Sequence, residues 1–268
     1  MTFDFAALLV VLTFGSGLIW AVDSWLLAPR RTSPIDAAAQ PASADRSGEP
    51  WLVEYARSFF PVFLIVLVLR SFVVEPFRIP SASMMPTLLI GDFILVNKYD
   101  FGIRLPVINI KILENGAPGR GDIVVFRYPE NPSIPYIKRV IGVPGDTFEY
   151  RDKRVYINGV EMAQEPMGHY DGQGAGRIMD GARRQRELLG EVSHEILVDP
   201  QLPGFDTRAV IPEGHYFVLG DNRDNSKDSR VWGFVPDQNL IGRAFMIWMN
   251  WDTKNGGIAW KRIGTILQ

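Results

Sequence analysis

The chain has 268 residues, a net charge of −2 and no cysteine, so its length allows one large domain or two small ones. The near-zero charge gives no electrostatic basis for nucleic acid as a partner. Without cysteine, disulfides, thiolate zinc sites and a cysteine nucleophile are excluded. The histidines at 169, 194 and 215 lack metal-ligand spacing, so we expect no metal and no cofactor.

Two apolar runs near the N-terminus are long enough to cross a bilayer core, which needs about 20 residues. The first, FAALLVVLTFGSGLIWAV, is uncharged, and it lacks the preceding basic region of a cleaved signal peptide. The second, residues 59–74, carries Arg70 near its far end, where a long side chain can reach the interface. A buried core helix is the alternative, but the second run shows no 3.6-residue stripe and no polar face. We therefore predict transmembrane segments at residues 1–28 and 59–76.

Residues 29–58 separate the two runs and are rich in Ala, Pro and Ser without hydrophobic periodicity, which is typical of a flexible loop. No Lys or Arg precedes the first run, whereas the loop carries Arg30, Arg31, Arg46 and Arg57. The positive-inside rule places such a loop in the cytosol. The N-terminus and residues 77–268 are then expected on the outer side of the membrane.

From residue 77 the sequence changes to short segments rich in β-branched and aromatic residues, bounded by Gly, Pro, Asn or Asp. They read DFILVNKYDF, GDIVVFRYP, YIKRVIGV, DTFEYRDKRVYING, GHYFVLGD and RAFMIWMNWD. No amphipathic helix separates them, which argues against a parallel sheet. We predict a mainly β fold: two N-terminal transmembrane helices, then an antiparallel β-rich domain with a smaller inserted β unit at about 150–210. The tryptophans at 248, 251 and 260 suit either a core or a lipid–water interface.

The stretch PSASMMP places Ser83 nine residues beyond Val74, so Ser83 lies within about 30 Å of the end of the second run. A turn serine is the ordinary interpretation, because a nucleophilic serine needs a base. His215 is one candidate base. The strand YIKRVIGVPGD offers another, because a desolvated lysine such as Lys138 can lose its proton, whereas Arg139 stays charged. Lowering a lysine pKa from about 10.4 to about 8 costs roughly 3 kcal/mol, which burial can supply.

A third segment, GDNRDNSKDSRVWGFVP at 220–236, is dense in Asp and Asn. A calcium loop beginning at Asp221 would place Arg223 as its third ligand, and one beginning at Asn222 would place Gly233 where the bidentate Glu belongs. Calcium is therefore excluded. A polar turn is possible for some of these residues, but the following apolar residues favour a rigid, hydrogen-bonded loop packed against the domain.

These three segments, in this order after two spans, resemble bacterial type I signal peptidase (leader peptidase), a family of serine proteases with a Ser–Lys dyad. The resemblance runs from the second apolar run to about Asp252. It implies that Ser83 is the nucleophile and Lys138 its general base. It also implies that the Ser81 hydroxyl and the Ser83 amide form the oxyanion hole, and that Ser226 hydrogen-bonds and orients the lysine.

The same resemblance implies ion pairs near the site between Asp221 and Arg139 and between Asp228 and Arg230. Ala82 stands where many relatives have glycine. The implied activity is removal of signal peptides from secreted preproteins by cutting after small residues, at Ala-x-Ala type sites. Expected partners are preprotein signal peptides, the phospholipid bilayer and the protein-export translocon. The expected location is the bacterial cytoplasmic (inner) membrane, as a multi-pass protein with its catalytic domain on the extracytoplasmic or periplasmic side.

Other functions remain open at this point. One is a Ser–His hydrolase that uses Ser83 and His215. Another is a membrane-tethered β domain that binds or scaffolds proteins of the cell envelope without peptidase activity. A self-cleaving Ser–Lys regulator fits less well, because such proteins act in the cytosol and would not need two spans.

Overall fold

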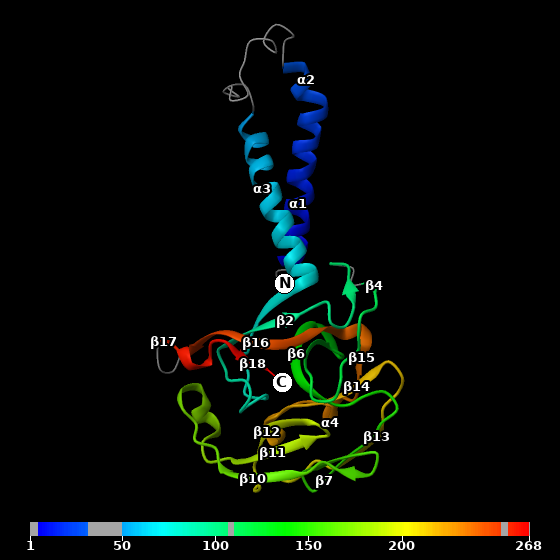
Figure 1. The fold of residues 1–268 in the computed structure, drawn as a ribbon, viewed down its shortest axis with the longest axis vertical. Helices are drawn as coiled ribbons and strands as arrows, with labels where there is room; N and C mark the ends of the chain where they lie inside the picture. The colour runs from blue at the N-terminus through cyan, green and yellow to red at the C-terminus, as the bar shows by residue number, and fades with distance from the viewer. Residues whose placement is uncertain (1–4, 32–49, 107–109, 253–256, 268) are drawn as a thin grey trace. The chain divides into compact units, whose positions relative to one another are not determined.

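The computed structural model of the chain describes residues 5–31, 50–106, 110–252 and 257–267. The chain divides into two compact units (Figure 1). One comprises Met1–Val73 with Arg104–Ile110, and the other comprises Val74–Ile103 with Lys111–Gln268.

The first unit is built from apolar helices. Its elements are α1 (Phe5–Val22), a π-helical turn (Asp23–Leu27), α2 (Ala28–Arg31), α3 (Trp51–Val68) and a second π-helical turn (Leu69–Val73). The stretches Phe5–Leu27 and Trp51–Val73 each have 23 residues and are apolar enough to cross a membrane. At about 1.5 Å per residue, each is roughly 34 Å long, close to the thickness of a bilayer core.

α1 and α3 pack against each other through a small residue and two rings. Gly17 faces the Phe60 ring so closely that an added Cβ would lie 2.7 Å from it. The rings of Trp20 and Phe60 lie 5.6 Å apart. Large apolar side chains point outward, with Val11 67% and Phe14 70% exposed, which suits helices surrounded by lipid.

The ends of the second helix differ from the prediction. α3 begins at Trp51 rather than at residue 59, because the extended Pro50 presents its carbonyl to the amides of Val53 and Glu54 at 2.9 and 3.2 Å. Glu54 also places a negative charge at the positive end of the helix. Residues 51–58 are thus helical rather than part of the loop, whose residues 32–49 lie outside the described part of the chain. At the other end, strand β1 already begins at residue 74.

The second unit is mainly β. Its strands, with β3 and β4 at the boundary between the units, are β1 (Val74–Arg78), β2 (Asp92–Asn97), β3 (Ile103–Arg104), β4 (Lys111–Leu113), β5 (Ile123–Tyr128), β6 (Asn131–Gly142), β7 (Thr147–Arg151), β8 (Arg154–Ile157), β9 (Val160–Glu161), β10 (Gln164–His169), β11 (Arg183–Leu189), β12 (Val192–Val198), β13 (Thr207–Val210), β14 (His215–Leu219), β15 (Val235–Pro236), β16 (Leu240–Asp252), β17 (Gly257–Ile258) and β18 (Thr265–Ile266). Its helical turns are Gly174–Met179, Arg223–Asn225, α4 (Ser229–Trp232), Asp237–Asn239 and Trp260–Arg262.

The main sheet has the order β1-β2-β16-β5-β6-β14-β15, with β17 and β18 also pairing with β16. The sheet β13-β7-β8-β9 and the sheet β10-β11-β12 are smaller (Figure 1). Neighbouring strands in the two smaller sheets run antiparallel, as do β5, β6 and β14 in the main sheet. The predicted fold class is confirmed: two apolar helices precede a mainly antiparallel β domain, and β10-β11-β12 falls in the segment predicted as the smaller β unit.

Strand β6 separates two apolar cores, because the side chains of a strand alternate between its faces. Ile137 belongs to the core that contains Ile94 and Val125, whereas Val140 belongs to the core that contains Phe126 and Val218. All residues of β6 from Ile137 to Gly142 are buried. The two charged residues between them, at 138 and 139, must therefore find polar partners inside the domain.

Candidate active site

The turn between β1 and β2 presents two serine hydroxyls. Ser83 is half-buried and Ser81 is exposed, and their Oγ atoms lie 3.3 Å apart. The neighbouring Met84 and Met85 are 1% and 0% exposed and anchor the turn in the domain. Ala82 is not among the residues with a positive φ, so its Cβ causes no backbone strain here.

Lys138 reaches this turn from β6. Its Nζ lies 2.7 Å from Ser83 Oγ and donates to the Ile137 carbonyl at 2.8 Å. The side chain is buried, with 4% of the residue exposed. Burial lowers the pKa of Lys138 from 10.5 to about 8, although Asp228 and Asp221 oppose the shift. Roughly a tenth of Lys138 is therefore neutral at pH 7, far more than for a lysine with an ordinary pKa.

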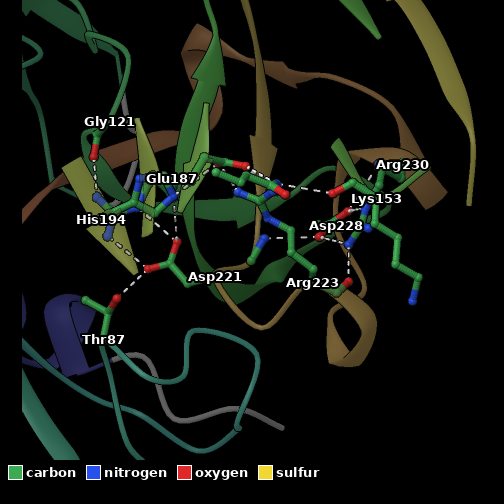
Figure 2. Close-up of polar contacts among 12 residues, drawn as sticks. Thr87, Gly121, Lys153, Glu187, His194, Asp221, Arg223, Asp228 and Arg230 are labelled. Atoms are coloured by element: carbon green, nitrogen blue, oxygen red, sulfur yellow. Dashed lines mark hydrogen bonds and ion pairs between the residues drawn. The ribbon is translucent and has the colours of Figure 1, made fainter. Parts of the chain in front are cut away.

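Two buried ion pairs join Arg139 to Asp221 and Arg230 to Asp228, the pairs that the family resemblance implies; Figure 2 labels Asp221, Asp228 and Arg230. Arg139 donates to both carboxylate oxygens of Asp221 at 2.9 Å and to the Gly121 carbonyl at 2.7 Å. Arg230 makes the second bidentate pair, with Asp228, through contacts of 2.8 Å. The carboxylates of these two pairs are the charges that raise the Lys138 pKa against burial.

The segment after β14 is tied directly to the Ser83 turn. The Asn222 amide donates to the Ser83 carbonyl at 3.1 Å, and its side-chain Nδ2 donates to the Ala82 carbonyl at 3.0 Å. Gly220 lies so close that an added Cβ would overlap both Ser226 Oγ and the Ser83 carbonyl oxygen. Main-chain contacts thus set the position of the nucleophile turn relative to residues 220–222.

The structure corrects the contact predicted for Ser226. Within the described residues, the buried Ser226 Oγ has no hydrogen-bond partner, and so it does not bond the lysine. The contacts that Lys138 Nζ makes are with the Ser83 hydroxyl and the Ile137 carbonyl. Ser226 still lies at the site, because it is packed against Gly220.

The histidine candidate for the base does not contact the serine. His215 Nδ1 lies 2.9 Å from the Glu213 carbonyl oxygen, and its ring packs edge-on against Phe234 at 6.2 Å. No hydrogen bond joins His215 to Ser83 in the described part of the chain. Among the described residues there is also no group of three or more His, Cys, Asp or Glu placed to hold a metal ion.

Three buried residues near the site were not singled out from the sequence: Glu187, His194 and Arg223 (Figure 2). The Arg223 guanidinium is bidentate to Glu187. His194 Nε2 lies 3.4 Å from Glu187 and 3.9 Å from Asp221. The only sequence signal was a Glu and a His in strand-like segments of an otherwise solvated region, which does not identify their partners.

The geometry as a whole provides a hydroxyl within hydrogen-bond distance of a buried amine with a lowered pKa. This is the arrangement that a serine nucleophile with a lysine base requires. A second hydroxyl, on Ser81, lies beside the first and can donate to an oxygen bound there.

Known proteins resemble this chain along most of its length. Residues 52–251 match the family described as "Signal peptidase, peptidase S26". The signal peptidase I of Pseudomonas aeruginosa is 46% identical over 290 aligned positions, covering 99% of this chain and 100% of that protein. The signal peptidase I of Pseudomonas fluorescens is 48% identical over 273 positions, covering 94% of each. The crystal structure of a signal peptidase I from Enterococcus faecalis V583 is 33% identical, with a TM-score of 0.32, and covers 47% of this chain and 96% of that one.

The chain therefore belongs to the signal peptidase family, peptidase S26. Members of this family are serine endopeptidases, and the two apolar helices indicate a membrane-anchored protein.

Proposed function

We propose that this protein is a membrane-bound endopeptidase that removes N-terminal signal peptides from secreted preproteins, with a Ser83–Lys138 dyad. The observation that carries the proposal is the 2.7 Å contact between Lys138 Nζ and Ser83 Oγ in a buried site. Membership of the signal peptidase family supplies the substrate class.

Acylation begins with neutral Lys138. Its Nζ accepts the Ser83 proton while Oγ attacks the carbonyl carbon of the scissile bond. The resulting oxyanion accepts hydrogen bonds from the Ser81 hydroxyl and the Ser83 amide, and each such donor is worth roughly 3 kcal/mol in known cases. Lys138 then passes its proton to the departing nitrogen, which leaves as the new N-terminus of the mature protein.

Deacylation uses the same groups. Lys138, neutral again, takes a proton from a water molecule that attacks the ester carbon of the acyl-enzyme. The ester bond to Ser83 Oγ breaks as Lys138 returns its proton to that oxygen, and the released signal peptide, first a carboxylic acid, loses its own proton to solvent and becomes a carboxylate. The ion pairs of Asp221 with Arg139 and of Asp228 with Arg230 hold the surrounding loop, and their carboxylates raise the lysine pKa against the larger effect of burial.

We further propose that cleavage follows small residues, at Ala-x-Ala type sites, as the family resemblance implies. Phe5–Leu27 and Trp51–Val73 would form the two spans, the residues between them would include the cytoplasmic loop, and the β-rich unit that begins at Val74 would be the catalytic domain. We propose that the domain lies on the extracytoplasmic or periplasmic side of the bacterial inner membrane, and the arginines of the loop support this orientation by the positive-inside rule.

The expected partners are signal peptides of preproteins, the phospholipid bilayer and the protein-export translocon. Anchoring enzyme and substrate in one bilayer raises their effective concentration. Trp248, Trp251 and Trp260 are 38%, 48% and 74% exposed, which supports a role at the lipid–water interface rather than in a core.

The test is cleavage of a model preprotein by the full chain in lipid vesicles, with the new N-terminus identified by mass spectrometry. Wild type is compared with Ser83→Ala and His215→Ala. We expect wild type and His215→Ala to cut after a small residue and Ser83→Ala to be inactive but folded. Equal processing by wild type and Ser83→Ala would refute the proposal and favour a scaffold or binding role. An inactive, folded His215→Ala variant would instead favour a Ser–His hydrolase.

A further inference from the structure

The sheet β10-β11-β12 directs two buried ionisable side chains toward the catalytic segments. Glu187 on β11 and His194 on β12 are directly opposite each other across the two strands. Their side chains are 0% and 2% exposed, although most charged residues of this sheet face solvent. A buried carboxylate persists only where its partners compensate for the lost hydration, so the contacts of Glu187 are informative.

Both carboxylate oxygens of Glu187 accept hydrogen bonds. Arg223 donates through Nη1 to Glu187 Oε1 at 2.7 Å and through Nη2 to Oε2, and Gln164 Nε2 donates to Oε1 at 2.9 Å. Burial opposes ionisation, but the Arg223 charge together with the polar contacts of Arg223 and His194 outweighs it and holds the pKa of Glu187 well below its usual range. The pair is therefore ionised and bidentate, the geometry that fixes a guanidinium most firmly.

Arg223 directly follows the residue that holds the nucleophile turn. Its neighbour Asn222 donates to the carbonyls of Ser83 and Ala82, as described above. The Arg223 carbonyl in turn accepts from Arg230 Nη2 (Figure 2). Fixing Arg223 thus fixes the segment that contacts Ser83 on one side and the Asp228–Arg230 pair on the other.

Strand β12 supports the same segment independently. The Leu197 amide donates to the Asp221 carbonyl at 2.9 Å, and Leu197 forms a parallel bridge with Asn222. Its side chain packs in one buried cluster with Ala82 and Met85. The small sheet therefore contacts the nucleophile turn both directly, through apolar packing, and indirectly, through residues 221–223.

His194 fills the space between two carboxylates of this arrangement. Its Nε2 lies 3.4 Å from Glu187 and 3.9 Å from Asp221, and Asp221 pairs with Arg139 beside the catalytic lysine. Burial and the nearby Arg139 lower the pKa of His194, so the imidazole is neutral. It separates the two negative charges without adding a charge of its own.

We propose that Glu187 is a positioning residue for the Ser83–Lys138 site, acting through Arg223 and Asn222 on the main chain of Ser83. The small sheet is then a support of the catalytic site rather than a peripheral insertion. The inference rests on the proposed function, because its effect is measured on peptide cleavage. Small displacements of a reacting group, near 1 Å, can cost about a hundredfold in rate, so loosening this contact should affect turnover strongly.

The test compares Glu187→Gln and Glu187→Asp with a matched control, Glu195→Gln. Glu195 makes a bidentate pair with Arg184 on the same two strands, but their side chains are 33% and 35% exposed, and within the described residues the hydrogen bonds of the Glu195 carboxylate go to Arg184. We expect both Glu187 variants to lose at least tenfold in kcat for a precursor peptide, with KM within about twofold, while Glu195→Gln matches wild type. Amide hydrogen exchange at Asn222 should also accelerate in the Glu187 variants only.

Activities are expressed per folded molecule, from the thermal transition of each variant in lipid. A folded Glu187→Asp protein with wild-type kcat and wild-type exchange at Asn222 would overturn the inference, even if its melting temperature falls. If Glu187→Gln does not fold, the result for Glu187→Asp, which keeps the negative charge, decides whether the inference stands. If wild type itself fails to cleave the precursor, the proposed function fails, whereas exchange at Asn222 still tests the contact.

Discussion

The ionisation of Lys138 leads to a quantitative prediction for the pH dependence of cleavage. Burial lowers its pKa from 10.5 to about 8, against the attraction of Asp228 and Asp221. A shift of this size corresponds to about 3 kcal/mol of preferential destabilisation of the charged form. Since only the neutral amine accepts the Ser83 proton, roughly a tenth of the enzyme is active at pH 7 and roughly nine tenths at pH 9.

The assay is kcat/KM for a precursor peptide between pH 6 and 10, with the folded state monitored at each pH. We expect an increase of about tenfold from pH 7 to pH 9, followed by a plateau. A lysine with an ordinary pKa would instead give an increase near a hundredfold over the same interval, still rising at pH 10. A rate that keeps rising to pH 10, or that shows no dependence above pH 7, would refute the assignment of a desolvated lysine as the base.

Three further outcomes follow from contacts in the second unit. Gly220→Ala places a Cβ against Ser226 Oγ and the Ser83 carbonyl, so it should abolish cleavage and lower stability by about 1–3 kcal/mol; unchanged turnover would contradict this packing. Asp92→Ala removes a fully buried carboxylate that accepts from Arg262 and leaves that cation unpaired, which should cost about 3 kcal/mol or more in a thermal unfolding experiment. Burial lowers the pKa of His194 below 6.5 in the folded protein, so His194 is protonated at a higher pH in the unfolded chain than in the folded one. The free energy of unfolding should therefore fall as the pH drops below 6.5. His194→Gln should reduce that slope between pH 7.5 and 5.5, and an identical slope in the variant would exclude His194 as its source.

Much of the fold could be predicted because its elements carry local signals. The segments around Lys138 and His215 are rich in β-branched and aromatic residues and bounded by turn residues, and they are strands in the structure. The first apolar helix also starts where its sequence indicates. The start of α3 could not be predicted, because Glu54 and Arg57 interrupt the apolar pattern although they lie within the helix.

In the candidate site, too, some features could be predicted from the sequence and others could not. The choice between Lys138 and Arg139 rested on chemistry, and the structure places Lys138 against Ser83 and Arg139 against Asp221. The hydrogen bond expected of Ser226 is absent in the described part of the chain, and a local sequence pattern does not specify such side-chain contacts.

Glu187 illustrates what local sequence cannot provide. It follows a run of Arg and Gln typical of a solvated strand, and its partner Arg223 is 36 positions away in the chain. Only the packing of the small sheet against residues 221–223 brings the two together. Long-range ion pairs of this kind are set by tertiary structure and leave no periodic pattern.

The most direct test of the central claim, that Lys138 is the base for Ser83, is the cleavage rate of Lys138→Arg in lipid vesicles. Arginine keeps the positive charge and much of the side-chain length but stays protonated at any working pH. The account predicts a folded protein with no cleavage above that of Ser83→Ala between pH 7 and 10. Processing by Lys138→Arg at a rate near that of wild type would contradict it.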